Sequence, residues 1–258
     1  MKITILGSGT STGVPVIGCD CPVCRSDAPE NTRLRSSIYV ENGDDKILID
    51  CSSDFRQQAL RAKLPRIDAV FPTHDHADHI NGIDDLRLFN FIQRNPIDLY
   101  AREDVVETVK RRYEYCFNPR QLGGGVPQLN LRPLSPGETV QLKSTAIQAI
   151  PIKHGILDIF GFRIGKKFAY LTDCSEVPES SVELLEGVEV LVVDALRKTP
   201  HSTHFSLSEA LDFSRRIQPR QTWFTHIACR MDHFETNEEL PDDAQLLYDG
   251  QVIEVNHD

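Results

Sequence analysis

The sequence predicts a layered α/β protein, because short apolar strands alternate with helical segments along most of its 258 residues. Length supports the same class, since a chain of this size can bury one sizeable core. No internal repeat or low-complexity segment interrupts the alternation. We therefore predict a single domain over residues 1–258.

The first half of the chain contains five predicted strands and three predicted helices. The strands cover residues 3–6, 36–40, 46–49, 67–71 and 97–100, and the helices cover 55–63, 84–91 and 103–117. Several prolines and a triple glycine then break the pattern in residues 118–136. This stretch is predicted to be a long loop between the two halves.

The second half repeats the α/β pattern. Predicted strands cover residues 139–142, 146–150, 160–164, 168–171, 189–193, 221–224 and 251–255. Ser206 and Glu209 form an S-x-x-E capping box, which predicts that a helix begins after Ser206. Apolar residues at helical spacing follow it and would face the core.

Charge and composition exclude some functions. The chain has 28 Lys and Arg against 38 Asp and Glu, and the net charge of −10 opposes charge-driven binding to nucleic acid or anionic membrane. A local positive pocket is still compatible with this balance. The sequence lacks an apolar run of roughly 20 residues and opens with a strand, so we expect a soluble, cytoplasmic protein. Seven cysteines favour metal ligation and free thiols over a disulfide framework.

A cluster of metal-ligand residue types follows the predicted strand 67–71. It reads H-x-H-x-D-H and consists of His74, His76, Asp78 and His79. In extended backbone His74 and His76 project to the same side, while the adjacent Asp78 and His79 can reach a second ion. Imidazole and carboxylate suit Zn, Mn or Fe. The alternative is a polar loop with three solvated histidines.

Three more candidate ligands follow apolar strands, namely His154, Asp173 and His226. Each alone is compatible with an ordinary loop or capping residue. Jointly they complete two sets: His74, His76 and His154 on one ion, and Asp78, His79 and His226 on the other, with Asp173 bridging. Two divalent ions, two carboxylates and a bridging hydroxide sum to about +1, which would attract a phosphodiester anion.

The order of these ligands resembles that of the metallo-β-lactamase superfamily. The resemblance extends from the Gly7-Ser8-Gly9-Thr10-Ser11-Thr12-Gly13-Val14-Pro15 loop to His226. It implies a four-layered αβ/βα sandwich with the metals at one edge of two sheets. It also implies a hydrolase of phosphodiesters, thioesters or related substrates, and not an antibiotic-degrading enzyme.

His204 is the predicted general acid, because it lies two residues before the capping-box serine and can donate a proton near neutral pH. The resemblance supports this role, since phosphodiesterase branches carry a histidine here, and Asp194 matches the acidic residue that orients it. The alternative is that His204 merely packs near the helix start. His201 is a weaker rival for the same role, and His233 and His257 are expected at the surface.

A second metal site is predicted from sulfur ligands. Cys19, Cys21 and Cys24 form C-x-C-x-x-C in a turn-rich segment, and three thiolates so close suit tetrahedral zinc. Cys229, three residues beyond His226, is the predicted fourth ligand of this structural zinc. An iron–sulfur or redox site is the alternative. The other cysteines, Cys51, Cys116 and Cys174, are expected to be ordinary thiols.

The cysteine motif after the glycine-rich loop is similar to one branch in particular, the phosphoribosyl cyclic phosphodiesterase of the carbon-phosphorus lyase pathway. That relative closes its structural zinc with a histidine, where this chain has Cys229. The leading hypothesis is therefore a phosphodiesterase that uses two Mn or Zn ions on a small cyclic or nucleotide-like phosphodiester. We expect no membrane or nucleic-acid partner, and the resemblance implies a homodimer.

Three other functions stay open. A tRNA 3′-end-processing endonuclease shares the G-T-S-x-G-V-P opening and the histidine of the capping-box loop, but the acidic balance and the absence of an obvious basic arm oppose it. Thioester hydrolysis uses the same ligand order without calling for His204. A metal-binding regulatory module without turnover belongs to a different class.

Overall fold

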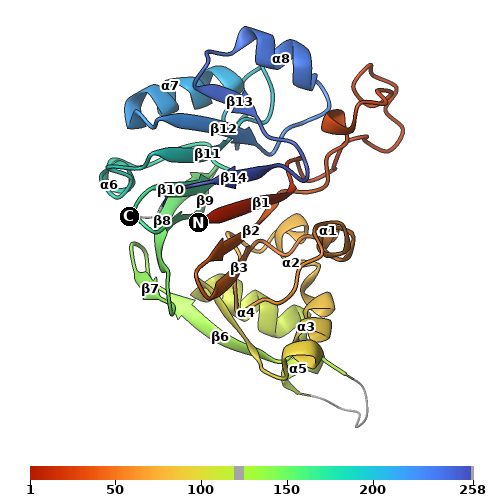
Figure 1. Cartoon of the computed structure of the whole chain (residues 1–258), viewed down its shortest axis with the longest axis vertical. Helices are drawn as coiled ribbons and strands as arrows, with labels where there is room; N and C mark the ends of the chain where they lie inside the picture. Colours follow the sequence, from red (N-terminus) through yellow and green to blue (C-terminus); the bar gives the residue numbers. More distant parts are fainter. Residues whose placement is uncertain (119–124, 257–258) are drawn as a thin grey trace.

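Two stacked seven-stranded sheets form the centre of the computed structural model, which describes residues 1–118 and 125–256 (Figure 1). In sheet order, the first contains β14 (Val252–Glu254), β1 (Lys2–Gly7), β2 (Ser37–Asn42), β3 (Asp45–Ile49), β4 (Ala69–Phe71), β5 (Ile97–Arg102) and β6 (Leu129–Leu134). The second contains β13 (Ala244–Leu246), β12 (Gln221–Thr225), β11 (Val190–Asp194), β10 (Phe168–Leu171), β9 (Leu157–Ile164), β8 (Ala146–His154) and β7 (Thr139–Gln141).

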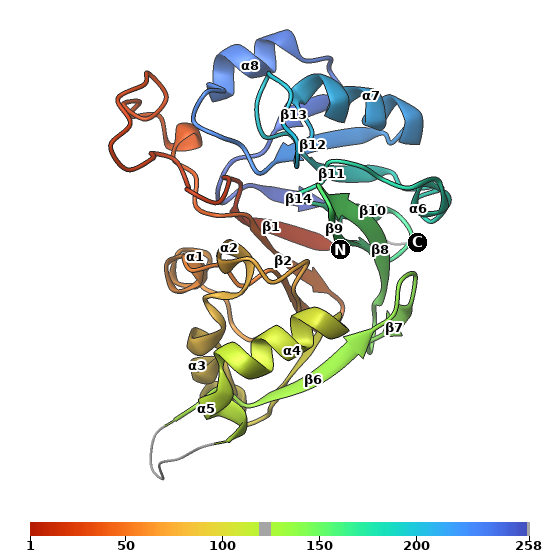
Figure 2. The same ribbon diagram turned by 180° about the vertical axis from the view of Figure 1, so that it is seen from behind.

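Helices cover the outer face of each sheet (Figures 1 and 2). The first sheet carries α1 (Phe55–Ala62), α2 (Ala77–Ile80), α3 (Leu86–Gln93), α4 (Glu103–Arg112) and α5 (Glu114–Phe117). The second carries α6 (Glu179–Glu183), α7 (Leu207–Ile217) and α8 (His233–Glu239). The predicted four-layered αβ/βα sandwich is therefore confirmed.

Apolar side chains fill the space between the two sheets. Alternate residues of most strands point into this layer, as the period of two along a strand requires. Phe71 of β4 and Phe162 of β9 meet edge to face there, with ring centroids 5.4 Å apart. Two further apolar clusters lie between each sheet and its helices. The stack is thus held mainly by burial of apolar area.

Strand direction determines where polar residues gather. β3 runs parallel to β4, and β10, β11 and β12 are parallel to one another. β8 is antiparallel to β9, which is antiparallel to β10, so β8 and β10 point the same way. The loops that leave these strands therefore emerge at common edges, where their side chains can converge.

Two predicted elements differ from the structure. The predicted loop 118–136 contains β6, which carries Pro133; residues 119–124 lie outside the described part. Proline is tolerated because β6 is an edge strand and one side of it needs no ladder partner. The predicted helix 103–117 divides into α4 and α5 at Tyr113, whose φ of −113° and ψ of 38° leave the helical region.

The capping box that was predicted for α7 is confirmed. The Ser206 side chain accepts a hydrogen bond from the Glu209 backbone N–H, and the Glu209 carboxylate accepts one from the Ser206 backbone N–H at 2.8 Å. Ser206 lies two residues after His204, so the cap also fixes the position of that histidine relative to the start of α7. In the described chain, no helix is both long and apolar enough to cross a bilayer.

Replacing Ser206 with alanine should lower the free energy of unfolding by about 1 kcal/mol, because the first turn of α7 loses its capping acceptor. Urea denaturation followed by circular dichroism measures this change. Ser180→Ala, at an exposed position on α6, is the matched control and should be close to neutral. Equal stability of the two variants would contradict the capping role of Ser206.

Candidate metal-binding active site

All seven predicted ligands of the metal pair come together at the carboxyl ends of strands. The loop after β4 and the short α2 supply His74, His76, Asp78 and His79, and the ends of β8, β10 and β12 supply the other three. Within each of two groups the candidate ligand atoms lie within 4.8 Å of one another. The groups are His74, His76 and His154, and Asp78, His79, Asp173 and His226.

Asp173 connects the two groups. One of its carboxylate oxygens also lies within 4.8 Å of ligand atoms of His154 and His204. Asp173 therefore reaches a histidine of the first group while belonging to the second. This position is the one expected of a carboxylate between two ions.

Three residues at the site have left-handed backbone. Asp50, Asp173 and His226 have φ values of 60°, 54° and 61°. Asp50 and His226 directly follow strands β3 and β12, and Asp173 lies two residues after the end of β10. The other described non-glycine residues with positive φ are the C-terminal caps of α1, α3 and α7, where this conformation is ordinary. Without a helix end to explain it, such backbone is costly and is typical of functional sites.

Hydrogen bonds to Nδ1 orient three of the histidines. His79 Nδ1 lies 2.8 Å from a carboxylate oxygen of Asp50, and His154 Nδ1 lies 2.8 Å from the carbonyl oxygen of Thr203. His74 Nδ1 pairs with the Thr73 hydroxyl at 3.0 Å. With Nδ1 engaged, Nε2 is the nitrogen left free to bind a metal, and its orientation is fixed by the partner of Nδ1.

Two histidine nitrogens without hydrogen-bond partners indicate whether these residues suit a metal. Nε2 of His74 and Nε2 of His79 are buried and have no hydrogen-bond partner among the described residues. His79 Nε2 lies 3.1 Å from Asp78 and 3.2 Å from Asp173, but without the alignment of a hydrogen bond. Buried polar atoms without partners are rare in folded proteins. Divalent cations between these nitrogens and carboxylates would satisfy them, so the donor set fits.

Electrostatics favour the ligand forms of four of the five histidines and of Asp173. The exception is His79: although burial alone would lower it, the carboxylates of Asp50, Asp173 and Asp78 raise the pKa of this imidazole well above its usual value. Burial lowers the pKa of His74, His76 and His154, and it lowers the pKa of His226 to about 4. Although burial alone would raise it, the imidazoles of His226 and His79 hold the pKa of Asp173 well below its usual range. Neutral imidazoles and ionised carboxylates are the forms that bind divalent metals.

Asp50 is a site residue that the sequence reasoning missed. It is fully buried and accepts hydrogen bonds from the backbone N–H and the hydroxyl of Thr73, at 2.8 and 3.0 Å, besides contacting His79. It follows β3 directly, which is the same strand-end position that identified Asp173. That signal was available in the Ile47-Leu48-Ile49-Asp50 run.

His204 lies beside the metal-ligand cluster. Its Nδ1 is 2.7 Å from a carboxylate oxygen of Asp194, the last residue of β11. Its ring lies 4.7 Å from the His154 ring and stacks on His226 at 4.9 Å. Burial lowers the pKa of His204. The structure thus brings together the histidine and aspartate that were predicted as a proton donor and its orienting partner.

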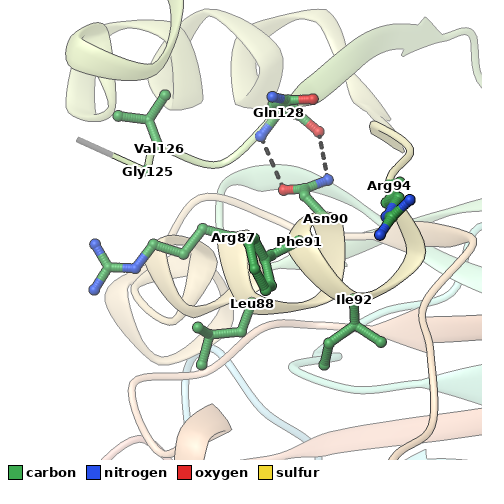
Figure 3. A pocket seen from close by; sticks show the side chains of 9 residues that line it. All are labelled: Arg87, Leu88, Asn90, Phe91, Ile92, Arg94, Gly125, Val126 and Gln128. Atoms are coloured by element: carbon green, nitrogen blue, oxygen red, sulfur yellow. Dashed lines mark hydrogen bonds between the residues drawn. The ribbon is translucent and has the colours of Figure 1, made fainter. Parts of the chain in front are cut away.

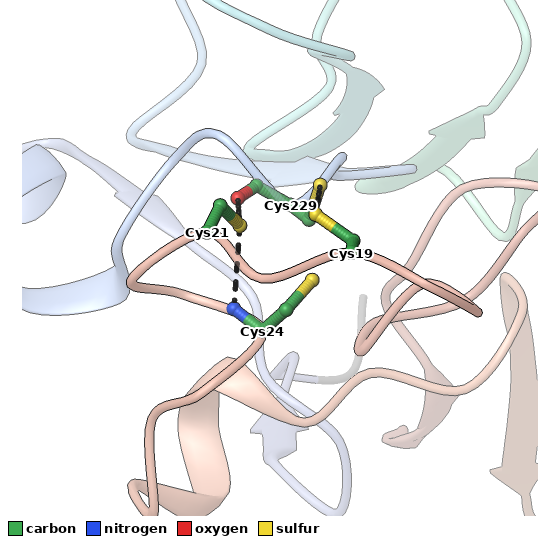
Figure 4. A group of neighbouring side chains, drawn as sticks. All are labelled: Cys19, Cys21, Cys24 and Cys229. Atoms are coloured by element: carbon green, nitrogen blue, oxygen red, sulfur yellow. Dashed lines mark hydrogen bonds between the residues drawn. The ribbon is translucent and has the colours of Figure 1, made fainter.

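The four predicted zinc cysteines also converge (Figure 4). Their sulfurs lie within 4.8 Å of one another, with Cys19 Sγ and Cys229 Sγ 3.9 Å apart. Zinc–sulfur bonds of about 2.3 Å in a tetrahedron place sulfurs about 3.8 Å apart, so the spacing suits zinc. A hydrogen bond from the Cys24 backbone N–H is the main cause that lowers the pKa of Cys21 to about 7, and it favours the thiolate.

The remaining predicted residues lie elsewhere. Cys51 and Cys174 are buried and Cys116 is partly buried, as ordinary thiols. The surface position expected for His233 is wrong, because its ring is buried at the start of α8 between Arg33, at 3.4 Å, and the ring of Tyr248. His257 lies outside the described residues.

A groove of about 860 Å³ on the outer side of α3 is separate from the metal-ligand cluster (Figure 3). Asn90 forms its floor and pairs with the backbone of Gln128 through two hydrogen bonds of 2.9 and 3.0 Å. Leu88, Phe91 and Ile92 are exposed along it. None of the clustered histidines, aspartates or cysteines lines this groove, so we place the chemistry at the strand ends.

Asp50→Asn should weaken metal binding about 10- to 100-fold, because an amide orients the His79 imidazole less well than a carboxylate does. Competition titration with a chromogenic zinc chelator measures the affinity. The matched control is Asp212→Asn, whose side chain is 74% exposed on α7. Affinities of the Asp50 variant and wild type within twofold would contradict the orienting role.

Cys229→Ala should reduce the bound zinc by one ion per chain, because three sulfurs would then hold the ion without their fourth partner. Elemental analysis of purified protein gives the count. Cys116→Ala, which changes a thiol outside the cluster, should keep the wild-type content. An unchanged count in the Cys229 variant would exclude this cysteine as a ligand.

Sequence relatives include enzymes of several activities. An octanoyltransferase of Porphyromonas gingivalis is 36% identical over 253 residues, which cover 97% of this chain but 51% of that protein. The chain therefore spans about half the length of this relative. A ribonuclease Z of Bradyrhizobium is 26% identical over 141 residues, which cover 53% of this chain and 46% of the ribonuclease.

Solved structures show the same fold over nearly the whole chain. A crystal structure described as a new diphosphatase of the PhnP family is 40% identical, with a TM-score of 0.91 and coverage of 99% of this chain and 98% of that one. Zinc-bound PqqB of Methylobacterium extorquens has a TM-score of 0.83, covers 99% of this chain and 100% of that one, and is 21% identical. Because PqqB is only 21% identical to this chain, its similarity shows a shared fold alone.

The family model of the β-lactamase superfamily domain matches residues 45–227, a range that contains all seven predicted ligands of the metal pair, from His74 to His226. Sandwich architecture, ligand order and clustered donor atoms agree with this match. The chain therefore belongs to the β-lactamase superfamily and is a metal-dependent hydrolase of the metallo-β-lactamase fold, similar to the PhnP-family members of that group.

Proposed function

We propose that this protein is a phosphodiesterase that uses two divalent metal ions to hydrolyse a small cyclic or nucleotide-like phosphodiester. One observation carries the proposal most directly. A histidine oriented by a buried carboxylate, His204 with Asp194, stands against the two groups of metal-ligand residues. Ester hydrolysis at phosphorus requires such a proton donor wherever the departing oxygen is a poor leaving group.

The proposed metals are Mn or Zn, held by His74, His76 and His154 on one side and by Asp78, His79 and His226 on the other, with Asp173 between them. When bound, the ions would supply an acidified water as nucleophile and positive charge for the phosphoryl oxygens. A third ion, zinc, is proposed for Cys19, Cys21, Cys24 and Cys229. Its role would be to brace the loop that also carries His226.

The protein's own residues have separate tasks in this proposal. His204 gives a proton to the leaving oxygen as the phosphorus–oxygen bond breaks, and Asp194 holds its ring through Nδ1 so that Nε2 faces the substrate. Asp78, beside His79, adds negative charge that keeps a cation in place. Asp50 and Thr203 fix the rings of His79 and His154.

Comparison with the diphosphatase of the PhnP family supports hydrolysis of a phosphate ester or anhydride, because the 40% identity extends over 99% of this chain. Octanoyl transfer is not proposed, since this chain spans only half of the relative that bears that name.

Processing of tRNA 3′ ends is the second candidate function. The ribonuclease Z relatives and the shared G-T-S-x-G-V-P opening favour it. The net charge of −10 opposes it, because RNA binding depends on cationic surface. Cleavage of a precursor tRNA, with release of the 3′ trailer, distinguishes this activity from hydrolysis of small diesters. A regulatory module without turnover would bind metal and hydrolyse neither substrate.

His204→Ala should reduce kcat about 100- to 10,000-fold on a 2′,3′-cyclic nucleotide, whose leaving ribose oxygen needs a proton. The loss should be much smaller on bis(p-nitrophenyl) phosphate, because p-nitrophenolate leaves without one. Steady-state rates with Mn- or Zn-loaded protein test both substrates, and metal content should match wild type. Equal rates of variant and wild type on the cyclic substrate would exclude His204 as the acid.

A further inference from the structure

Residues 197–205 form a closed loop beside the active site, and the proposed reaction uses this loop only through His204 and Thr203. Its base is fixed by hydrogen bonds from Leu196 N to Phe205 O at 3.0 Å and from Phe205 N to Cys174 O at 2.6 Å. The loop contains two cationic side chains, two histidines, three hydroxyl side chains and no carboxylate. In a chain with a net charge of −10, this loop therefore has a local excess of positive charge.

His201 is held in one orientation by this loop. Its Nδ1 receives hydrogen bonds from the Thr203 backbone N–H at 3.3 Å and from the Thr203 hydroxyl at 3.2 Å. Because a backbone N–H can only donate, Nδ1 is the acceptor and the neutral ring carries its proton on Nε2. The same Thr203 holds His154 through its carbonyl oxygen. One residue therefore fixes both a metal-ligand ring and the His201 ring.

The position of His201 places it on the leaving-group side. Its ring centroid lies 5.2 Å from that of His204, and His204 in turn contacts His154 and His226. In a displacement at phosphorus, the attacking water and the leaving oxygen lie on opposite sides. His204 protonates the leaving oxygen, so a side chain just beyond His204 faces the group that departs. His201 is partly exposed and can contact that group.

The charges around His201 favour the binding of an anion. The Arg197 guanidinium donates to the carbonyl oxygens of Thr199 at 3.1 Å and Pro200 at 2.7 Å, contacts that leave its positive charge unneutralised. Lys198 is paired with Glu239 at 2.6 Å and contributes little net charge. A fixed N–H donor beside an arginine is the arrangement that binds phosphate oxygens.

We propose that His201 is a specificity residue that donates its Nε2–H to an anionic leaving group, so that the preferred substrate releases a phosphate monoester. This inference rests on the proposed phosphodiesterase activity and narrows its substrate class. Such substrates contain a P–O–P linkage or a leaving alcohol that bears its own phosphate. Water adds to one phosphorus and the bond to the leaving oxygen breaks. His204 supplies the proton where the leaving oxygen is that of an alcohol, whereas a leaving phosphate departs as the anion that His201 holds.

Kinetics on two substrates test this assignment. Diadenosine diphosphate releases adenosine monophosphate, whereas a 2′,3′-cyclic nucleotide opens to an uncharged ribose hydroxyl. His201→Ala should lower kcat/KM about 10- to 100-fold on the first, mainly through KM, and less than about threefold on the second. His201→Gln, which keeps an N–H donor, should recover much of the loss. Ser202→Ala, in the same loop and exposed, should behave as wild type.

Binding of adenosine monophosphate provides a readout that needs no turnover. Calorimetry should show a Kd about tenfold higher for His201→Ala than for wild type. Equal losses of His201→Ala on both substrates, a wild type that prefers the cyclic nucleotide, or unchanged nucleotide binding would each overturn the assignment. A wild type without activity on either substrate, but with nucleotide binding that depends on His201, would instead contradict the proposed function and leave the anion-binding role of this residue supported.

Discussion

The convergence of buried imidazoles and carboxylates at the strand ends is the constraint on which the rest of the structure depends. Nε2 of His74 and of His79 is enclosed without a hydrogen-bond partner among the described residues, while Asp50, Asp78 and Asp173 surround His79. An apolar core tolerates such groups only if their charges and lone pairs are satisfied. A pair of divalent cations would satisfy both, and the residues Asp50, Asp173 and His226, which have left-handed backbone, lie in this cluster.

The loop after β12 connects three parts of this arrangement. It begins with His226, a proposed metal ligand. It continues through Ile227, whose carbonyl oxygen accepts a 3.1 Å hydrogen bond from Thr10 N, and reaches Cys229 of the sulfur cluster. The glycine-rich segment after β1, the catalytic edge and the cysteine loop are therefore held by a few consecutive residues. This connection explains why a structural zinc would influence a site to which it contributes no ligand atom.

Much of the fold and most of the candidate site could be predicted, because short stretches of the sequence contain the signals for both. Metal-ligand residue types stand directly after apolar strands, and strand direction alone then brings His154, Asp173 and His226 to one edge. Asp50 was missed although it occupies the same kind of position, because it contacts a ligand histidine instead of completing a ligand motif. β6 was missed because prolines suggested a loop, and only the sheet order shows it to be an edge strand. The burial of His233 depends on Arg33, which lies 200 residues away in sequence, and no local pattern signals such a contact.

The central claim is that the clustered residues hold two cations. Anomalous diffraction from crystals grown with Mn or Zn, recorded at the absorption edge of the metal, tests it most directly. Two peaks should appear a few ångströms apart, one among His74, His76 and His154 and the other among Asp78, His79 and His226, with Asp173 contacting both. Crystals that show no peak at this edge of the sheets, with metal in excess, would contradict the claim.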